Sequence, residues 1–134
     1  MGVIRFTQKD LDRNRPFEPG WKKCEVVGMA EKLSKKKDSI NRVVSFKVGL
    51  GEDDERSYDH TFSEKALGMM EPFIAAALNV VIDAETDYDE SLLIGKQLWI
   101  EFTKEIYKDA NNPNDRGRPV NRAIAFASLD NPPF

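Results

Sequence analysis

The aromatic and cationic side chains of this chain are its best candidates for a functional site, and the function that they suit is binding. Aromatic rings stack on the faces of unpaired bases, and Lys and Arg side chains contact phosphates. The aromatic candidates are Trp21, Trp99 and Tyr107. The cationic candidates are Lys22, Lys35, Lys36, Lys37, Lys47, Arg116, Arg118 and Arg122. A groove built from both types would accept single-stranded nucleic acid with little sequence preference, because phosphate charge and the π face of any base suffice.

Catalytic chemistry has few candidates. His60 is the only histidine and Cys24 the only cysteine, and the chain has no Gly-rich phosphate loop and no nucleophilic Ser motif. A lone cysteine offers neither an internal disulfide nor a thiolate metal site. We therefore expect no catalytic residue, no cofactor and no metal, and predict that the protein is not an enzyme. The remaining catalytic alternative is a magnesium site held by Asp83, Asp87 and Asp89.

The net charge of −3 hides an asymmetry along the chain. Residues 1–48 hold 12 basic and 6 acidic side chains, residues 49–95 hold 2 and 12, and residues 96–134 hold 6 and 5, so the three segments carry +6, −10 and +1. A mildly acidic total therefore does not exclude a polyanionic partner. The acidic stretches Glu52 to Glu55 and Asp83 to Glu90 leave open a second function class, a protein-interaction module that binds a basic protein.

Length and composition predict one domain. The 134 residues, of 15.3 kDa, suit a single core, which we place over residues 1–134 with an arm at 1–19 and a tail at 127–134. The chain is 40% hydrophobic with a mean hydropathy of −0.53, and no apolar run approaches the roughly 20 residues that span a bilayer. It starts without the pattern of a secretory signal. We expect a cytoplasmic protein without a membrane partner.

Alternating apolar and polar residues predict five strands, at 21–33, 40–48, 57–62, 96–107 and 120–129. Gly28 marks a bulge in the first strand. In the fourth, the side chains expected to point inward are Leu98, Ile100, Phe102 and Ile106. Trp99 and Tyr107 then point outward, as Lys47 does in the second strand. The loops at 34–39 and 108–119 could flank one groove.

A helix is expected between the third and fourth strands. Ser63 suits a helix N-cap, and Leu67, Met70 and Ile74 follow at helical spacing. Pro72 predicts a kink, or two short helices that end near residue 78 or 79. Three strands, a helix and two strands give a mainly β, five-stranded barrel in the order of the OB-fold, a fold whose exposed face commonly binds single-stranded nucleic acid.

A resemblance to known proteins agrees with this order. The stretches that carry it are Pro19 to Trp21, Val26 and Val27, Glu31 to Lys36, Val43 to Phe46, Ser63 to Leu67, Leu93 to Lys96, Leu98 and Trp99, and Asn121 and Arg122. The chain resembles phage-encoded single-stranded DNA-binding proteins of OB type over about residues 19 to 126. The resemblance implies a non-catalytic protein that coats single-stranded DNA during phage replication or recombination, in the host cytoplasm.

The C-terminus carries a second resemblance. The final residues, Leu129 to Phe134, are similar to the acidic tip of bacterial single-stranded DNA-binding proteins, which docks replication and repair partners. The resemblance implies that Asp130, Pro133 and Phe134 bind partner proteins, since a terminal carboxylate and an aromatic ring suit a basic-rimmed apolar pocket. The tip departs from that family by its single acidic residue and short linker. The sequence leaves the oligomeric state open, a homo-oligomer included.

Overall fold

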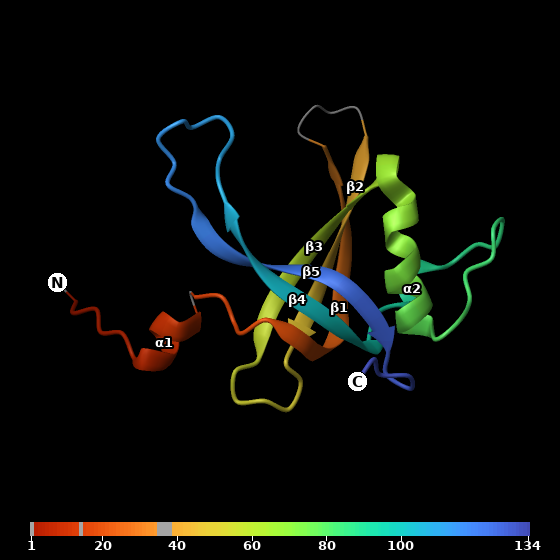
Figure 1. Cartoon of the computed structure of the whole chain (residues 1–134), viewed down its shortest axis with the longest axis horizontal. Coiled ribbons are helices and arrows are strands. Elements are labelled where there is room, and N and C mark those ends of the chain that lie inside the picture. Colours follow the sequence, from red (N-terminus) through yellow and green to blue (C-terminus); the bar gives the residue numbers. More distant parts are fainter. Residues whose placement is uncertain (1, 14, 35–38) are drawn as a thin grey trace.

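The computed structural model describes residues 2–13, 15–34 and 39–134 (Figure 1). Its elements, in chain order, are α1 (Gln8–Arg13), β1 (Gly20–Leu33), β2 (Ile40–Val48), β3 (Arg56–Ser63), η1 (Glu64–Met70), α2 (Glu71–Leu78), η2 (Glu90–Leu92), β4 (Gln97–Tyr107) and β5 (Arg118–Ser128). The strands form one antiparallel sheet in the order β3-β2-β1-β4-β5. The predicted mainly β fold, with its helical segment between the third and fourth strands, is confirmed.

β1 is the central strand of the sheet and pairs with a different neighbour along each half of its length. Its first residues, 20–25, pair with β4, and its residues 24–33 pair with β2. The register shifts between Val26 and Gly28, at the predicted bulge. A bulge bends a strand and increases its twist. The sheet therefore coils, and the side chains of Cys24 and Val26 are fully buried on its inner face.

The two edge strands, β3 and β5, are bridged by side chains rather than by a backbone ladder, so the barrel is partly open. The Tyr58 hydroxyl accepts a hydrogen bond from the backbone N–H of Ala123 at 3.0 Å. Tyr58 also packs edge-on against Phe102 in β4, with ring centroids 5.0 Å apart. His60 contacts Phe126 of β5 in the same gap. Tyr58 and His60 of β3 thus face β5 and the core.

The helical segment covers one end of the core. Ser63 caps η1 by accepting a hydrogen bond from Lys65 N at 3.2 Å, as predicted. Pro72 lies in the first turn of α2, where a missing N–H leaves no bond unmade. Asn79, in a left-handed conformation, ends α2. The predicted pair of short helices is confirmed, and α2 inserts Phe73 against Phe46 and Phe62.

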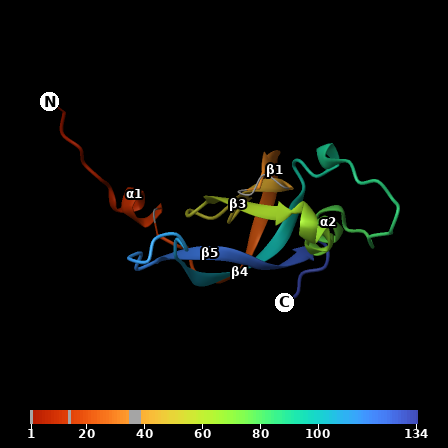
Figure 2. The same ribbon diagram turned by 90° about the horizontal axis from the view of Figure 1, so that it is seen from above.

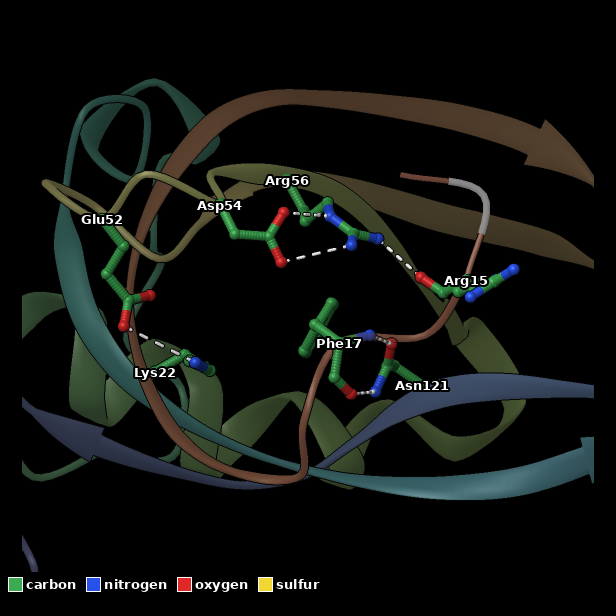
Figure 3. Close-up of polar contacts among 7 residues, drawn as sticks. All are labelled: Arg15, Phe17, Lys22, Glu52, Asp54, Arg56 and Asn121. Carbon is green, nitrogen blue, oxygen red and sulfur yellow. Dashed lines mark hydrogen bonds and ion pairs between the residues drawn. The ribbon is translucent and has the colours of Figure 1, made fainter. Parts of the chain in front are cut away.

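The N-terminal arm contributes to the core, which the sequence reading missed. Phe17 is buried and packs edge-on against Phe102, with ring centroids 4.9 Å apart. The Asn121 side chain accepts a hydrogen bond from Phe17 N and donates one to Phe17 O, both at 2.9 Å. Arg56 donates to the carbonyl of Arg15, and Figure 3 shows this second fastening beside the first. The chain just before β1 is therefore tied across the end of the β3–β5 gap.

The inward placement of Ile106 is wrong. β1 pairs with β4 only as far as Phe102, so the last residues of β4 have β5 as their single partner. This two-stranded hairpin extends beyond the core (Figure 1), and Ile106 is 61% exposed. The hairpin loop is shorter than expected, because β5 begins at Arg118. Within the described parts of the chain, no helix has the length and apolar character needed to cross a bilayer.

Candidate nucleic-acid interface

One face of β4 carries the aromatic residues that the sequence reading selected. Opposite the buried Leu98, Ile100 and Phe102, alternation directs the other residues outward. We call this set the outward β4 face, and its members are Trp99, Glu101, Thr103, Glu105 and Tyr107. Trp99 and Tyr107 therefore share a face, separated along the strand by about 26 Å at 3.3 Å per residue.

Trp21 of β1 joins this face. Its partner in the register is Glu101, whereas Trp99 pairs with Lys23. The two indoles are thus diagonal neighbours on the same side of the sheet, within reach of each other's edges. On the other flank of β4, the partners of Trp99 and Glu101 are the small residues Ala127 and Ala125. Both indoles are half-buried.

Two arginines of β5 border the outward β4 face near its far end. The Arg118 guanidinium lies over the ring of Tyr107, with its carbon 5.5 Å from the ring centroid. Arg122 pairs in register with Thr103 and forms an ion pair with Glu105 at 3.4 Å. Both arginines are exposed, and the exposed Arg116 lies in the hairpin loop just before β5. The Tyr107 end is accordingly the basic end of the face.

The charges on this side of the sheet nearly balance. Pairing and alternation direct the cations Lys23, Lys47, Arg118 and Arg122 to the same side as the anions Glu25, Glu101 and Glu105. Figure 1 shows the acidic segment 83–90 beside α2, away from the β4–β5 hairpin. The face is therefore neither a strongly basic groove nor a surface ringed by the acidic segments.

The C-terminal tail lies over Trp99. Asp130 accepts a hydrogen bond from Asn79, and the Phe134 ring meets the Trp99 ring edge-on with centroids 4.9 Å apart. Phe134 itself is 72% exposed. The Trp99 Nε1 atom is buried and has no hydrogen-bond acceptor within the described residues. The tip predicted to dock partners thus contacts its own domain in this structure.

Other predicted cations lie elsewhere. Lys22 is on the opposite side of β1 from Trp21, and it forms an ion pair with Glu52 at 3.5 Å (Figure 3). Lys47 is exposed on β2 and forms an ion pair with Glu55 at 3.8 Å. Its register partner is Glu25, so it lies on the predicted outward side of the sheet, two strands away from β4. The loop lysines Lys35, Lys36 and Lys37 lie outside the described residues. The structure therefore gathers Trp21, Trp99, Tyr107, Arg118 and Arg122, places Lys47 farther out on the same side, and sets Lys22 apart.

Lys23 is a candidate that sequence reading missed. It lies beside Trp99 in the register, on the face shared with Trp21. The signal was present in the alternation of β1, because residues 21, 23 and 25 must face the side opposite Cys24. The alternation therefore puts Lys23, and not Lys22, on the side of Trp21 and Trp99.

The side chains that could act as a nucleophile, a base or a metal ligand are buried or hydrogen-bonded within the fold. Cys24 is fully buried, and burial raises the pKa of its thiol to about 12. Burial lowers the pKa of His60 below its ordinary value. Asp89 accepts hydrogen bonds from Ser91 N and Ser91 Oγ, and these bonds lower its pKa. Among the described residues, no three potential ligands gather as a metal site.

The structure also contains two cavities away from the outward β4 face. One, of about 570 Å³, lies where the segment before β1 crosses between β3 and β5, and Arg15, Tyr58 and Asn121 are among its lining residues. The other, of about 540 Å³, lies between the helical segment and residues 82–93. Comparison with protein-family models and with curated proteins finds no match to this chain.

Proposed function

We propose that this protein binds single-stranded DNA without catalysis, on the outward β4 face, and acts in replication or recombination in the cytoplasm. The observation that carries the proposal is the placement of Trp21, Trp99 and Tyr107 on one side of the sheet. Tyr107 is exposed, and Trp21 and Trp99 are partly exposed. An accessible aromatic ring is a platform on which any base can stack, and each such contact is worth about 1–3 kcal/mol. The resemblance to phage single-stranded DNA-binding proteins supports DNA as the nucleic acid.

Phosphate contacts would come from the cations beside the rings. Lys23 lies next to Trp99, and Arg118 and Arg122 lie at the Tyr107 end. Because Glu101 and Glu105 share the face, the electrostatic attraction is moderate, and stacking contributes a larger share of the affinity than in a strongly basic groove. Arg122 would exchange Glu105 for a phosphate as the strand binds.

The Phe134 ring must leave Trp99 before a base can stack there. Its edge-on contact leaves the indole N–H without an acceptor among the described residues, and an unsatisfied buried donor costs about 1–3 kcal/mol. A nucleotide offers both a flat ring and acceptor atoms. The tail is thus a weak cover that a DNA strand replaces at little cost.

Titration with oligo-dT tests the proposal. We expect quenching of tryptophan fluorescence at micromolar protein, and binding that weakens as salt rises because phosphate contacts release counterions. Trp99→Ala should lower the affinity by about 5- to 100-fold, measured by anisotropy of a labelled oligonucleotide, without unfolding the domain. Arg118→Ala should weaken binding and flatten its salt dependence.

Lys32→Ala is the matched control, because Lys32 is an exposed cation of β1 beyond its pairing with β4. It should leave the affinity unchanged. The absence of salt-sensitive binding by the wild-type protein would contradict the proposal. An affinity that Trp99→Ala leaves intact would reject the outward β4 face as the site.

A further inference from the structure

The N-terminal segment presents apolar side chains to solvent. Val3, Ile4 and Phe6 are 91%, 82% and 65% exposed. Figures 1 and 2 show this segment and α1 projecting away from the sheet in both views. We call residues 2–7 the apolar arm. Clustered apolar residues exposed on a projecting segment are typical of an interaction site.

α1 gives the apolar arm a defined base. Thr7 Oγ1 accepts a hydrogen bond from Asp10 N at 3.1 Å, and Asp10 Oδ2 accepts one from Thr7 N at 2.9 Å. This reciprocal pair is a capping box, which fixes the direction of the chain as it enters a helix. The arm is therefore presented on an ordered turn, which lowers the entropy lost when it binds.

A cavity with an apolar lining, which suits the apolar side chains of the arm, lies at the opposite end of the molecule, beside α2. It occupies about 540 Å³ between η1, α2 and residues 82–93. Its apolar lining consists of Met29, Leu67, Met70, Ile74, Ile82 and Leu93. Apolar pockets of this size accommodate two or three hydrophobic side chains and exclude water from them.

The cavity has an acidic rim. Four of its lining residues are acidic: Glu71, Asp83, Asp87 and Glu90. Its one cationic lining residue, Arg42, is already bonded to Glu90 at 2.9 Å and to Glu64 at 3.1 Å. The rim therefore carries a net negative charge that suits an apolar segment with basic flanks.

We propose that the apolar arm of one copy docks into this cavity of a second copy. The two surfaces match in apolar character and in charge. Residues 2–15 hold four basic and two acidic side chains, whereas residues 83–90 hold five acidic and no basic ones. Arg5 lies within the arm, between Ile4 and Phe6, so apolar and basic groups arrive together. The proposal does not depend on DNA binding.

Geometry directs this docking to another molecule. The chain is fastened at Phe17 by Asn121, and Figures 1 and 2 show α2 and the acidic segment at the end away from the arm. An arm that points away from its own cavity fills that of a neighbour. Such a head-to-tail contact is heterologous, so copies associate in a row that becomes a ring only where the rotation between neighbours closes it.

Sedimentation velocity of the full chain without DNA tests the proposal. We expect the sedimentation coefficient of the wild type to rise with protein concentration. Ile4→Asp combined with Phe6→Asp should weaken association by at least about tenfold. The control, Val27→Asp combined with Leu33→Asp, places the same charges on exposed apolar positions of β1 and should associate as the wild type does.

A charge exchange tests the partner surface. Arg5→Glu and Asp87→Lys should each weaken association, and a mixture of the two variants should regain it, because each supplies the complementary charge to the other. Asp53→Lys, with the same charge change on the β2–β3 turn, should have no effect. A wild type that stays monomeric at all concentrations overturns the proposal, as does association that the arm variants leave unchanged.

Discussion

At the scale of single residues, the gap between β3 and β5 depends on one hydroxyl. Tyr58 Oη accepts from Ala123 N at 3.0 Å and lies 2.8 Å from His60 Nδ1. With His60 neutral and its proton on Nε2, the hydroxyl accepts the backbone N–H and donates its own hydrogen to Nδ1. A proton on Nδ1 would remove that acceptor. Neutral His60 therefore lets the Tyr58 hydroxyl make both hydrogen bonds across the open side of the barrel.

We predict a loss of stability as His60 becomes charged. Burial, with a smaller contribution from Arg122, lowers the pKa of His60 below its ordinary 6.5. The unfolded chain then binds more protons than the folded one, so the free energy of unfolding falls as the pH drops from about 7, through 6.5, to the lowered folded-state pKa. Urea denaturation at several values between pH 8 and pH 5 measures this slope.

His60→Phe is the control, because it keeps an aromatic ring in the gap and cannot take up a proton. The variant should lose the part of the slope that His60 contributes, whatever its absolute stability. The same slope in both proteins would show that other groups cause the pH dependence.

At the scale of elements, the segment before β1 acts as a strap across the barrel. Asn121 imitates a strand partner, since its amide makes one bond with each backbone group of Phe17. The strap thereby places Phe17 against Phe102 and covers one end of the partly open side. The Asn121 hydrogen bonds and the packing of Phe17 on Phe102 therefore hold the same residue in place.

Asn121→Ala should release the strap. Loss of both hydrogen bonds leaves the Phe17 backbone without its partner, and we expect a cost of about 1–3 kcal/mol in the free energy of unfolding. Chymotrypsin should then cleave faster after Phe17, whose following residue is Glu18. Asn121→Asp is the matched comparison, because it keeps the acceptor for Phe17 N and loses only the donor. Equal stability of Asn121→Ala and the wild type would show that the strap is held by Phe17 packing and by the Arg56 bond to Arg15 without Asn121.

At the scale of the whole molecule, Cys24 reports on cooperative opening. It is fully buried on the inner face of β1, and burial raises its pKa to about 12. A thiol reagent needs the thiolate and access to it, so labelling requires exposure of the core. We predict slow labelling of the native protein at neutral pH and rapid labelling in denaturant.

Asn121→Ala also calibrates this probe. If labelling follows global opening, each 1.4 kcal/mol of destabilisation should accelerate it about tenfold. Rapid labelling of the native wild type would contradict a sealed core. Labelling accelerated without any loss of stability would locate the opening at the strap instead.

Local patterns in the sequence predicted the succession of strands and helices along the chain, the bulge at Gly28, the Ser63 cap and the break before α2, because each follows from alternation or from local backbone chemistry. They also placed Trp99 and Tyr107 on one face, since a strand repeats every two residues. These features depend on neighbours close in the chain.

The tertiary structure alone decided which partners meet across long separations. Phe17 is buried because Asn121, 104 residues away, fastens its backbone. Ile106 is exposed because β1 ends its pairing with β4 too early to cover it. The tail reaches Trp99, and the apolar arm and the acidic cavity lie at opposite ends. Such contacts depend on how the sheet coils and where its edges end, which no local periodicity encodes.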